Sequence, residues 1–259
     1  MAEPASRVLR IGRLYFNGVN ACAVVGVQPD GSGKPFTVYG WNGITIAEWV
    51  YLCWPKPSTA WDRLSMIGDR WVDYPCTYLC TNNLNEWTYL IVVFGVRRPD
   101  GTHYEYSCRF FDIQNTWVHV VRMFTLDSRE FSVWLNGVKV YSVNVPSTNL
   151  TILEWNPDNA TNPKRYKQFI LGADTGIYTY MRSIYGEVRI YNRALSADEI
   201  YEIYSKGTVI KDGLVLCLPF HEGEGNIAHD VSGYDNHGTI YGGAMWTVKK
   251  ALRVLPKAR

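Results

Sequence analysis

A strand that runs directly into a capped helix is the feature of this chain that most restricts its fold. In the first half of residues 186–200, apolar and polar side chains alternate, as they do on a half-buried β-strand. Ser196 then stands three residues before Glu199, which is the spacing of a capping box at a helix N-terminus. Gly207 is a typical helix stop. The segment therefore predicts a strand followed at once by one short helix near 197–205.

The rest of the chain reads as short strands separated by turns. Asn136-Gly137 lies between two alternating runs and is a strong signal for a two-residue hairpin. Runs with the periodicity of a helix are rare. Aromatic residues, which are enriched in β-strands, make up 14% of the chain. Many short strands with one helix predict an all-β fold in which two antiparallel sheets pack as a sandwich. No low-complexity linker divides the 259 residues, so we expect a single domain.

Two segments resemble a known family. Residues 186–200 resemble the closing strand and helix of laminin G-like domains in the concanavalin A-like lectin/glucanase superfamily. Residues 214–246 begin Leu-Val-Leu-Cys-Leu-Pro-Phe and continue from Asp230 as Asp-Val-Ser-Gly-Tyr-Asp-Asn-His-Gly, which resembles the opening of the same domain. The resemblance implies a two-sheet jelly roll, usually extracellular or on a cell surface. Such a domain usually binds ligands, often sugars, and less often cleaves them.

The order of these segments is unusual, because the opening segment follows the closing one. Residues 14–21 are similar to the third strand of the family. The chain therefore resembles one laminin G-like domain over 1–259 in circularly permuted order, with 214–246 supplying the strands normally found first. Because the first and last strands of this fold are neighbours, we expect 214–220 to lie antiparallel beside 187–194.

Composition excludes two classes of function. The net charge is only +2 and 19% of the residues are charged, which argues against a nucleic-acid partner bound through phosphate contacts. No apolar run reaches about 18 residues, so we expect no membrane span. Only three glutamines occur, and a low glutamine content favours a thermostable protein from a thermophilic source.

Six cysteines leave two interpretations open. An even number in a fold of extracellular type permits disulfides, for which 15 connectivities exist, whereas cysteine is also among the most buried residues as a free thiol. Cys76 and Cys80, four residues apart, are the favoured pair if disulfides form.

A calcium ion and a plain turn are alternatives for the segment 230–238. Two aspartates, one asparagine and glycine carbonyls are oxygen ligands of the kind that Ca²⁺ takes, and the resemblance implies a calcium held by Asp230 and the loop near Asn236. The family commonly has another Asp where this chain has Gly186, which removes a carboxylate. Asp230 and Asn236 also suit a turn in which they bond their own backbone.

Aromatic side chains on long loops are the candidates for a ligand site. Sugars offer apolar C–H faces to aromatic rings, and loops of such length are often functional. We expect loops at 53–64, 72–86, 144–167 and 173–185. The candidate ligand-binding residues on them are Trp54, Trp61, Trp71, Tyr74, Tyr78, Trp155, Tyr178 and Tyr180.

Catalysis has little support in the sequence. Glycoside hydrolysis needs two carboxylates about 5–10 Å apart, yet Glu48, Glu105 and Glu187 each stand alone on a predicted strand. The favoured hypothesis is a non-catalytic extracellular binding module for carbohydrate or a surface protein. One alternative is a structural or assembly protein (a surface layer, filament or virion component) in which 214–246 pairs with a neighbouring chain. The other is a glycoside hydrolase or lyase.

Overall fold

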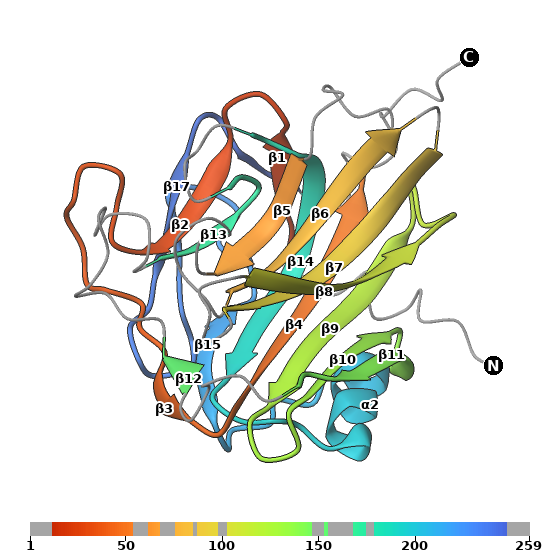
Figure 1. The fold of residues 1–259 in the computed structure, drawn as a ribbon. Helices are drawn as coiled ribbons and strands as arrows, with labels where there is room; N and C mark the ends of the chain where they lie inside the picture. Colours follow the sequence, from red (N-terminus) through yellow and green to blue (C-terminus); the bar gives the residue numbers. More distant parts are fainter. Residues whose placement is uncertain are drawn as a thin grey trace.

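The computed structural model describes residues 12–53, 62–67, 76–84, 87–97, 103–146, 153–154, 168–174 and 179–247. Within these residues the chain forms two antiparallel sheets of eight strands each, which pack face to face, and one helix on the outside (Figure 1). The all-β, two-sheet jelly-roll sandwich expected from the sequence is confirmed. In the described residues, no helix is long and apolar enough to cross a membrane.

Sheet A carries the helix. Its strands in spatial order are β11 (Val138–Asn144), β10 (Glu130–Leu135), β9 (Trp117–Thr125), β4 (Gly43–Leu52), β14 (Arg182–Tyr191), β1 (Leu14–Asn17) and β18 (Met245–Trp246). The eighth strand, β15 (Leu214–Leu218), pairs with the second half of β14, beyond the end of β1.

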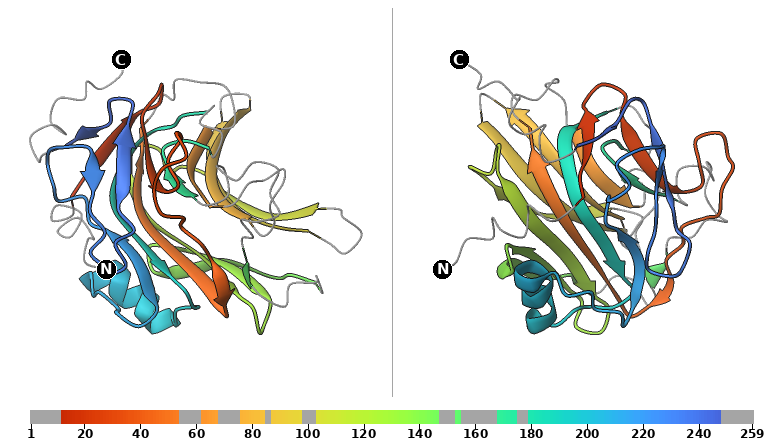
Figure 2. Two further views of the ribbon diagram at one scale, coloured as in Figure 1. Left: turned by 90° about the vertical axis from the view of Figure 1, so that its left-hand side faces the viewer. Right: turned by 180° about the vertical axis from the view of Figure 1, so that it is seen from behind.

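Sheet B lies opposite sheet A, as the two views of Figure 2 show. Its order is β16 (Ile227–Ala228), β17 (Gly238–Tyr241), β2 (Cys22–Gly26), β13 (Gln168–Leu171), β5 (Asp62–Ile67), β6 (Cys76–Leu84), β7 (Trp87–Arg97) and β8 (His103–Phe110). A small separate sheet joins β3 (Tyr39–Trp41) to β12 (Leu153–Glu154).

The pairing expected for the C-terminal segment is confirmed. β15 runs antiparallel to β14 within one chain, with Val188 opposite Leu218 and Ile190 opposite Leu216. This observation argues against an assembly in which that strand is given to a neighbouring chain. The permuted order relative to the family remains a prediction.

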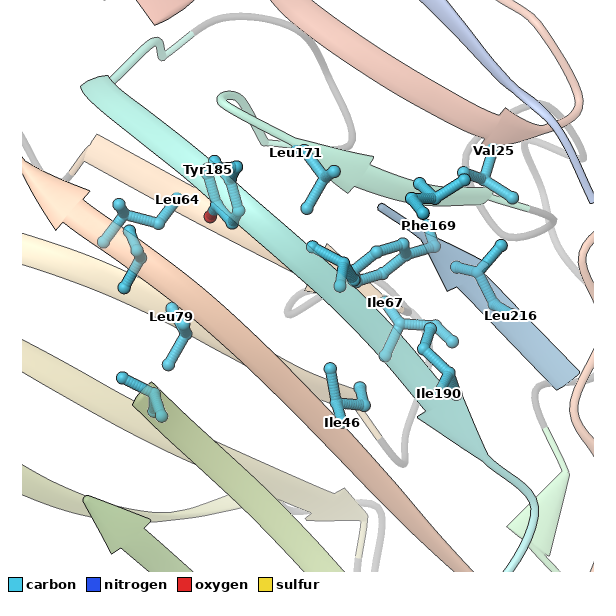
Figure 3. Close-up of a cluster of buried hydrophobic side chains, with 14 of the residues drawn as sticks. Val25, Ile46, Leu64, Ile67, Leu79, Phe169, Leu171, Tyr185, Ile190 and Leu216 are labelled. Atoms are coloured by element: carbon cyan, nitrogen blue, oxygen red, sulfur yellow. The ribbon is translucent and has the colours of Figure 1, made fainter. Parts of the chain in front are cut away.

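The main core fills the space between the sheets. Ile46 and Ile190 from sheet A meet Val25, Leu79 and Phe169 from sheet B, as Figure 3 shows. Side chains on a strand alternate between its two faces, so the intervening residues of sheet A point outward. On that outer face they form a second cluster around Val121 and Tyr191.

The helix α2 (Ala197–Lys206) covers this outer cluster of sheet A. Ser196 accepts a hydrogen bond from the Glu199 N–H and the Glu199 carboxylate accepts one from the Ser196 N–H, so the capping box is present. Gly207 ends the helix with φ 77°, a left-handed conformation that glycine adopts without a Cβ penalty. Ile200 and Ile203 are buried against the sheet.

Three of the loops expected from the sequence are wrong in whole or in part. Cys76–Leu84 was assigned to a loop, yet it is strand β6 and pairs with β7 along its whole length. The usual alternation of apolar and polar residues is missing from this strand, because the core-facing positions include the polar residues Thr77 and Thr81. β5 and β14 likewise begin inside the loops expected at 53–64 and 173–185.

Of the two interpretations of the cysteines, the free thiols are found, since all six cysteines are thiols. Cys76 and Cys80 lie four residues apart on one strand, which separates them by about 13 Å, and a disulfide needs Cα atoms within about 7 Å. Both are buried in the outer cluster of sheet B with Tyr78. Burial raises the pKa of Cys53 to about 12 and that of Cys217 to about 11.

Candidate ligand-binding pocket

Asp230 organises the loop between β16 and β17. Oδ1 accepts hydrogen bonds from the Cys217 N–H (2.8 Å) and the Ser232 N–H (2.9 Å). Oδ2 accepts from the Ser232 hydroxyl (2.7 Å) and the Asn236 N–H (2.9 Å). A carboxylate has about four lone-pair sites, so all of them are used in this loop.

The same loop covers the edge of strand β15. The Asn236 side-chain amide donates to the Val215 carbonyl (2.8 Å), and the Val231 N–H donates to the Cys217 carbonyl (2.9 Å). Together with the Cys217–Asp230 bond, these contacts satisfy backbone groups that an edge strand otherwise leaves open. The loop is therefore fixed to sheet A while it leads into β17 of sheet B.

His237 is held in one tautomer by this loop. Its Nδ1 accepts a hydrogen bond from the Asp230 N–H (3.0 Å), which requires the proton of the neutral ring to be on Nε2. Nε2 lies 4.0 Å from Oδ1 of Asp235, and both side chains are open to solvent. The ring presents an N–H donor beside an exposed carboxylate.

A second rigid turn faces this loop, after β2. The Gln28 N–H donates to the Ser32 carbonyl (2.7 Å), and Oδ1 of Asp30 accepts from the Ser32 N–H (2.8 Å) and hydroxyl (2.7 Å). Gly33 has φ 90°, and a Cβ there would stand 2.7 Å from the Gly26 carbonyl oxygen. Only glycine fits that position without displacing the backbone.

A pocket of about 320 Å³ lies between the two turns. β2 and β17 are neighbouring strands in Figure 1, and the pocket sits where β2 ends and β17 begins. Its lining is polar: Gly26, Gln28, Ser32, Gly33, Lys34, Asp235, Asn236, His237 and Thr239. The volume is at the lower end of ligand sites, which are about 300–1,000 Å³, so it suits a ligand the size of one sugar ring.

The charges around the pocket balance. Lys34 carries a positive charge and its Nζ donates to the Tyr234 carbonyl at 3.4 Å, Asp235 carries a negative charge, and the His237 ring accepts a hydrogen bond at Nδ1. A ligand with hydroxyl groups can accept from the Lys34 ammonium and donate to the Asp235 carboxylate, because a hydroxyl does both. An anionic ligand gains less, since Asp235 repels it.

One tyrosine contacts the pocket lining through its hydroxyl. The Tyr241 hydroxyl donates to Oε1 of Gln28 (3.0 Å), and Tyr241 packs with Tyr180 on a small cluster that includes Val24 and Ile170. Burial raises the pKa of both tyrosines. Tyr180, a member of the sequence-based ligand set, does not line the pocket: it pairs with Ala173 and packs on this cluster near Cys22, at the other end of β2.

The other candidate aromatic residues are not brought together in the described residues. Tyr78 is buried in sheet B with 1% exposure, its hydroxyl donates to Glu105 (2.8 Å), and the Arg63 guanidinium lies 4.5 Å from its ring centre. Tyr78 is therefore a packing residue rather than an open platform. Six candidates lie outside the described residues: Trp54, Trp61, Trp71, Tyr74, Trp155 and Tyr178.

Calcium does not fit Asp230 and Asn236 in this arrangement. Each carboxylate oxygen of Asp230 already accepts two hydrogen bonds, and a metal would have to displace donors such as the buried Cys217 N–H. In the part of the chain that the structure describes, no group of three or more His, Cys, Asp or Glu residues could hold a metal ion. The geometry favours the turn over the metal.

The three acidic residues considered for catalysis lie on different faces. Glu48 is buried between the sheets beside Arg122, Glu105 is on the outer face of sheet B, and Glu187 pairs with Arg189 at 2.7 Å. The structure therefore does not bring these acids together as a glycosidase pair.

Sequence reasoning missed most of the pocket, because Lys34 and His237 are far apart in the chain. The short run Asp30-Gly31-Ser32-Gly33 is a turn signal, yet nothing in it indicates which distant loop it faces.

Comparison with known proteins agrees with this fold. A laminin G family model, described as Concanavalin A-like lectin/glucanases superfamily, matches residues 41–201. No curated protein sequence matches the chain. Among solved structures, the heptameric SAP-like pentraxin of Limulus polyphemus aligns with a TM-score of 0.57 at 11% identity, over 93% of this chain and 96% of the pentraxin.

Two further solved structures share the fold. A "putative carbohydrate binding protein" from Bacteroides ovatus aligns with a TM-score of 0.58 at 16% identity, over 92% of this chain and 60% of that protein. The binding domain of botulinum neurotoxin serotype D has a TM-score of 0.50 at 11% identity, over 77% of this chain and 44% of the toxin chain. At such identities the likeness concerns the fold alone.

Proposed function

The chain belongs to the Concanavalin A-like lectin/glucanases superfamily, and we propose that it is a non-catalytic extracellular module that binds carbohydrate in the pocket between the turn after β2 and the loop before β17. The observation that carries this proposal is the convergence of Lys34, Asp235 and His237 on one small, charge-balanced pocket. Donors and acceptors arranged in this way suit the hydroxyl groups of a sugar.

Two further observations support a sugar rather than another polar ligand. The Tyr241 hydroxyl reaches Gln28 of the pocket lining, and a sugar ring offers an apolar face to an aromatic ring as well as hydroxyls to polar side chains. The Bacteroides ovatus protein of similar fold is described as carbohydrate binding. Extracellular location is part of the proposal because laminin G-like domains are typically extracellular.

A glycan array tests the proposal, with the protein at low micromolar concentration and three pocket variants beside it. We expect Lys34→Ala, Asp235→Asn and His237→Ala each to lower binding of the preferred glycan about tenfold or more, since each removes or weakens a hydrogen bond to the sugar. Lys211→Ala, an exposed lysine on the turn before β15, is the matched control and should bind as wild type does. Variants that bind like wild type would place the glycan elsewhere.

A further inference from the structure

The two sheets protect their edges unequally. β16 and β18 are edge strands of two residues each, β11 has a register shift against β10 and carries Lys139, and the edge of β15 is covered by the Asp230 loop. Short strands, bulges, lysines and covering loops are the usual means by which sheets avoid pairing with other chains. β8, in contrast, is eight residues long, has no register shift against β7 and carries no lysine.

β8 is a long and regular edge. It pairs with β7 without a register shift from Leu90–Phe110 to Arg97–His103, and no described strand lies on its other side. Glu105, Ser107 and Arg109 are exposed on the outer face of sheet B, where Glu105 accepts a hydrogen bond from the Tyr78 hydroxyl and the Arg109 guanidinium lies 5.2 Å from the Tyr89 ring centre. Tyr106, Cys108 and Phe110 face the core and are only half-buried, although they pack against it.

The sequence of β8 is complementary to itself. When two copies of the strand run antiparallel with Ser107 opposite Ser107, Glu105 of each copy stands opposite Arg109 of the other. Opposite charges at directly facing positions stabilise a strand pair, whereas like charges destabilise it. On the inner face of the same register, Tyr106 of one copy stands opposite Cys108 of the other, so apolar groups meet as well.

We propose that two copies of this chain associate through β8, antiparallel and centred on Ser107, so that sheet B continues from one copy into the next. The interface is symmetric, with the same surface used by both copies. Only this register makes both ion pairs: a shift of two residues in either direction takes Arg109 away from Glu105, and a parallel arrangement sets Glu105 against Glu105.

Charge reversal tests this register directly. Sedimentation velocity over a range of protein concentrations should show a dimer for wild type, and Arg109→Glu should weaken dimerisation about tenfold or more, because four carboxylates then face one another across the two symmetric pairs. Glu105→Arg should do the same. Mixed together, the two single variants should form a heterodimer, and the double variant Glu105→Arg/Arg109→Glu should dimerise again. The matched control Lys211→Glu changes charge equally, away from β8, and should leave the dimer unchanged.

A cysteine at the symmetry axis provides a second test that does not depend on charge. Residues opposite each other in antiparallel strands have Cα atoms about 4.5–5.5 Å apart, which is within reach of a disulfide. Ser107→Cys should therefore form a covalent dimer under mild oxidation, with the cross-link mapped to residue 107 by peptide mass spectrometry, while Ser128→Cys on an exposed turn should not. A wild-type protein that stays monomeric at every concentration, with no cross-link at residue 107 and no heterodimer, would overturn the proposal.

Discussion

Glu48 and Arg122 form a fully buried ion pair between the sheets. Oε2 of Glu48 lies 3.4 Å from Nη1 of Arg122 and accepts a hydrogen bond from the Ser65 hydroxyl (3.1 Å) across the core. Burial raises the pKa of Glu48 and lowers that of Arg122, and the attraction between the two groups opposes both shifts. Oε1 of Glu48 and Nε of Arg122 have no hydrogen-bond partner among the described residues. The pair therefore depends on both partners being present.

Removing one partner should cost more than removing both. We expect Glu48→Leu or Arg122→Met alone to lower the free energy of unfolding by about 3–5 kcal/mol, because the remaining group is buried without its counterion. The double variant Glu48→Leu/Arg122→Met should lose less than either single variant. Urea denaturation of the four proteins measures this coupling, and losses that simply add would contradict it.

Glu199 should make stability sensitive to acid. A hydrogen bond from the Arg193 guanidinium lowers the pKa of Glu199 to about 2, whereas an unfolded glutamate titrates near about 4.3. Between these two pKa values the unfolded chain binds more protons than the folded chain. The free energy of unfolding therefore falls as the pH falls from about 5 to 2. Denaturant midpoints measured over this range should fall less steeply for Glu199→Gln, and equal slopes would contradict the assignment.

Asp230 should stabilise the fold without any metal. Asp230→Ala leaves the Cys217 N–H and the Asn236 N–H without their acceptor, and an unsatisfied buried donor costs about 1–3 kcal/mol. We expect a lower melting temperature for Asp230→Ala, and wild-type melting curves that are the same in calcium and in chelator. Asp235→Asn, exposed on the same loop, is the control. If calcium raised the melting temperature of the wild type and Asp230→Ala abolished that rise, the result would support a calcium site at Asp230 instead.

At the scale of elements, the sequence predicted the features that depend on residues near one another in the chain. The capping box of α2 follows from residues close to one another in the chain, whereas the pairing of β14 with β15 was expected from the family resemblance. Strand β6 escaped prediction because Thr77 and Thr81 are buried polar residues, satisfied by the Val93 carbonyl and the Met181 sulfur. Such partners come from other strands, so sequence periodicity alone does not reveal them.

The pocket escaped prediction for the same physical reason. The segment 230–238 was identified as a candidate, yet its role depends on which groups Asp230 bonds, and Cys217 and Val215 belong to another strand. The Asn236 side-chain amide donates a hydrogen bond to β15 at its edge, while the neighbouring Asp235 and His237 face the turn after β2.

At the scale of the whole molecule, the two edges of sheet B differ. The Asp230 loop joins sheet A to the β16–β17 edge of sheet B, and the pocket lies there; β8 is at the opposite edge of sheet B. A dimer through β8 would leave both pockets accessible and far apart. Two linked sites gain avidity on a surface that displays many copies of the ligand.

Avidity should therefore distinguish the dimer from the monomer. On a surface dense in the preferred glycan, wild type should dissociate more slowly than Arg109→Glu by about tenfold or more, whereas binding to the free monovalent sugar should be equal for both. Surface plasmon resonance and isothermal titration calorimetry measure these quantities. Equal dissociation at high glycan density would contradict bivalent binding.

The most direct test of the central claim is a crystal structure of the wild-type protein with the glycan that the array selects. We predict sugar density in the pocket between the turn after β2 and the loop before β17, with ring hydroxyls within hydrogen-bond distance of Lys34, Asp235 and Nε2 of His237. A sugar bound on any other surface, with the pocket filled only by solvent, would contradict the proposed site.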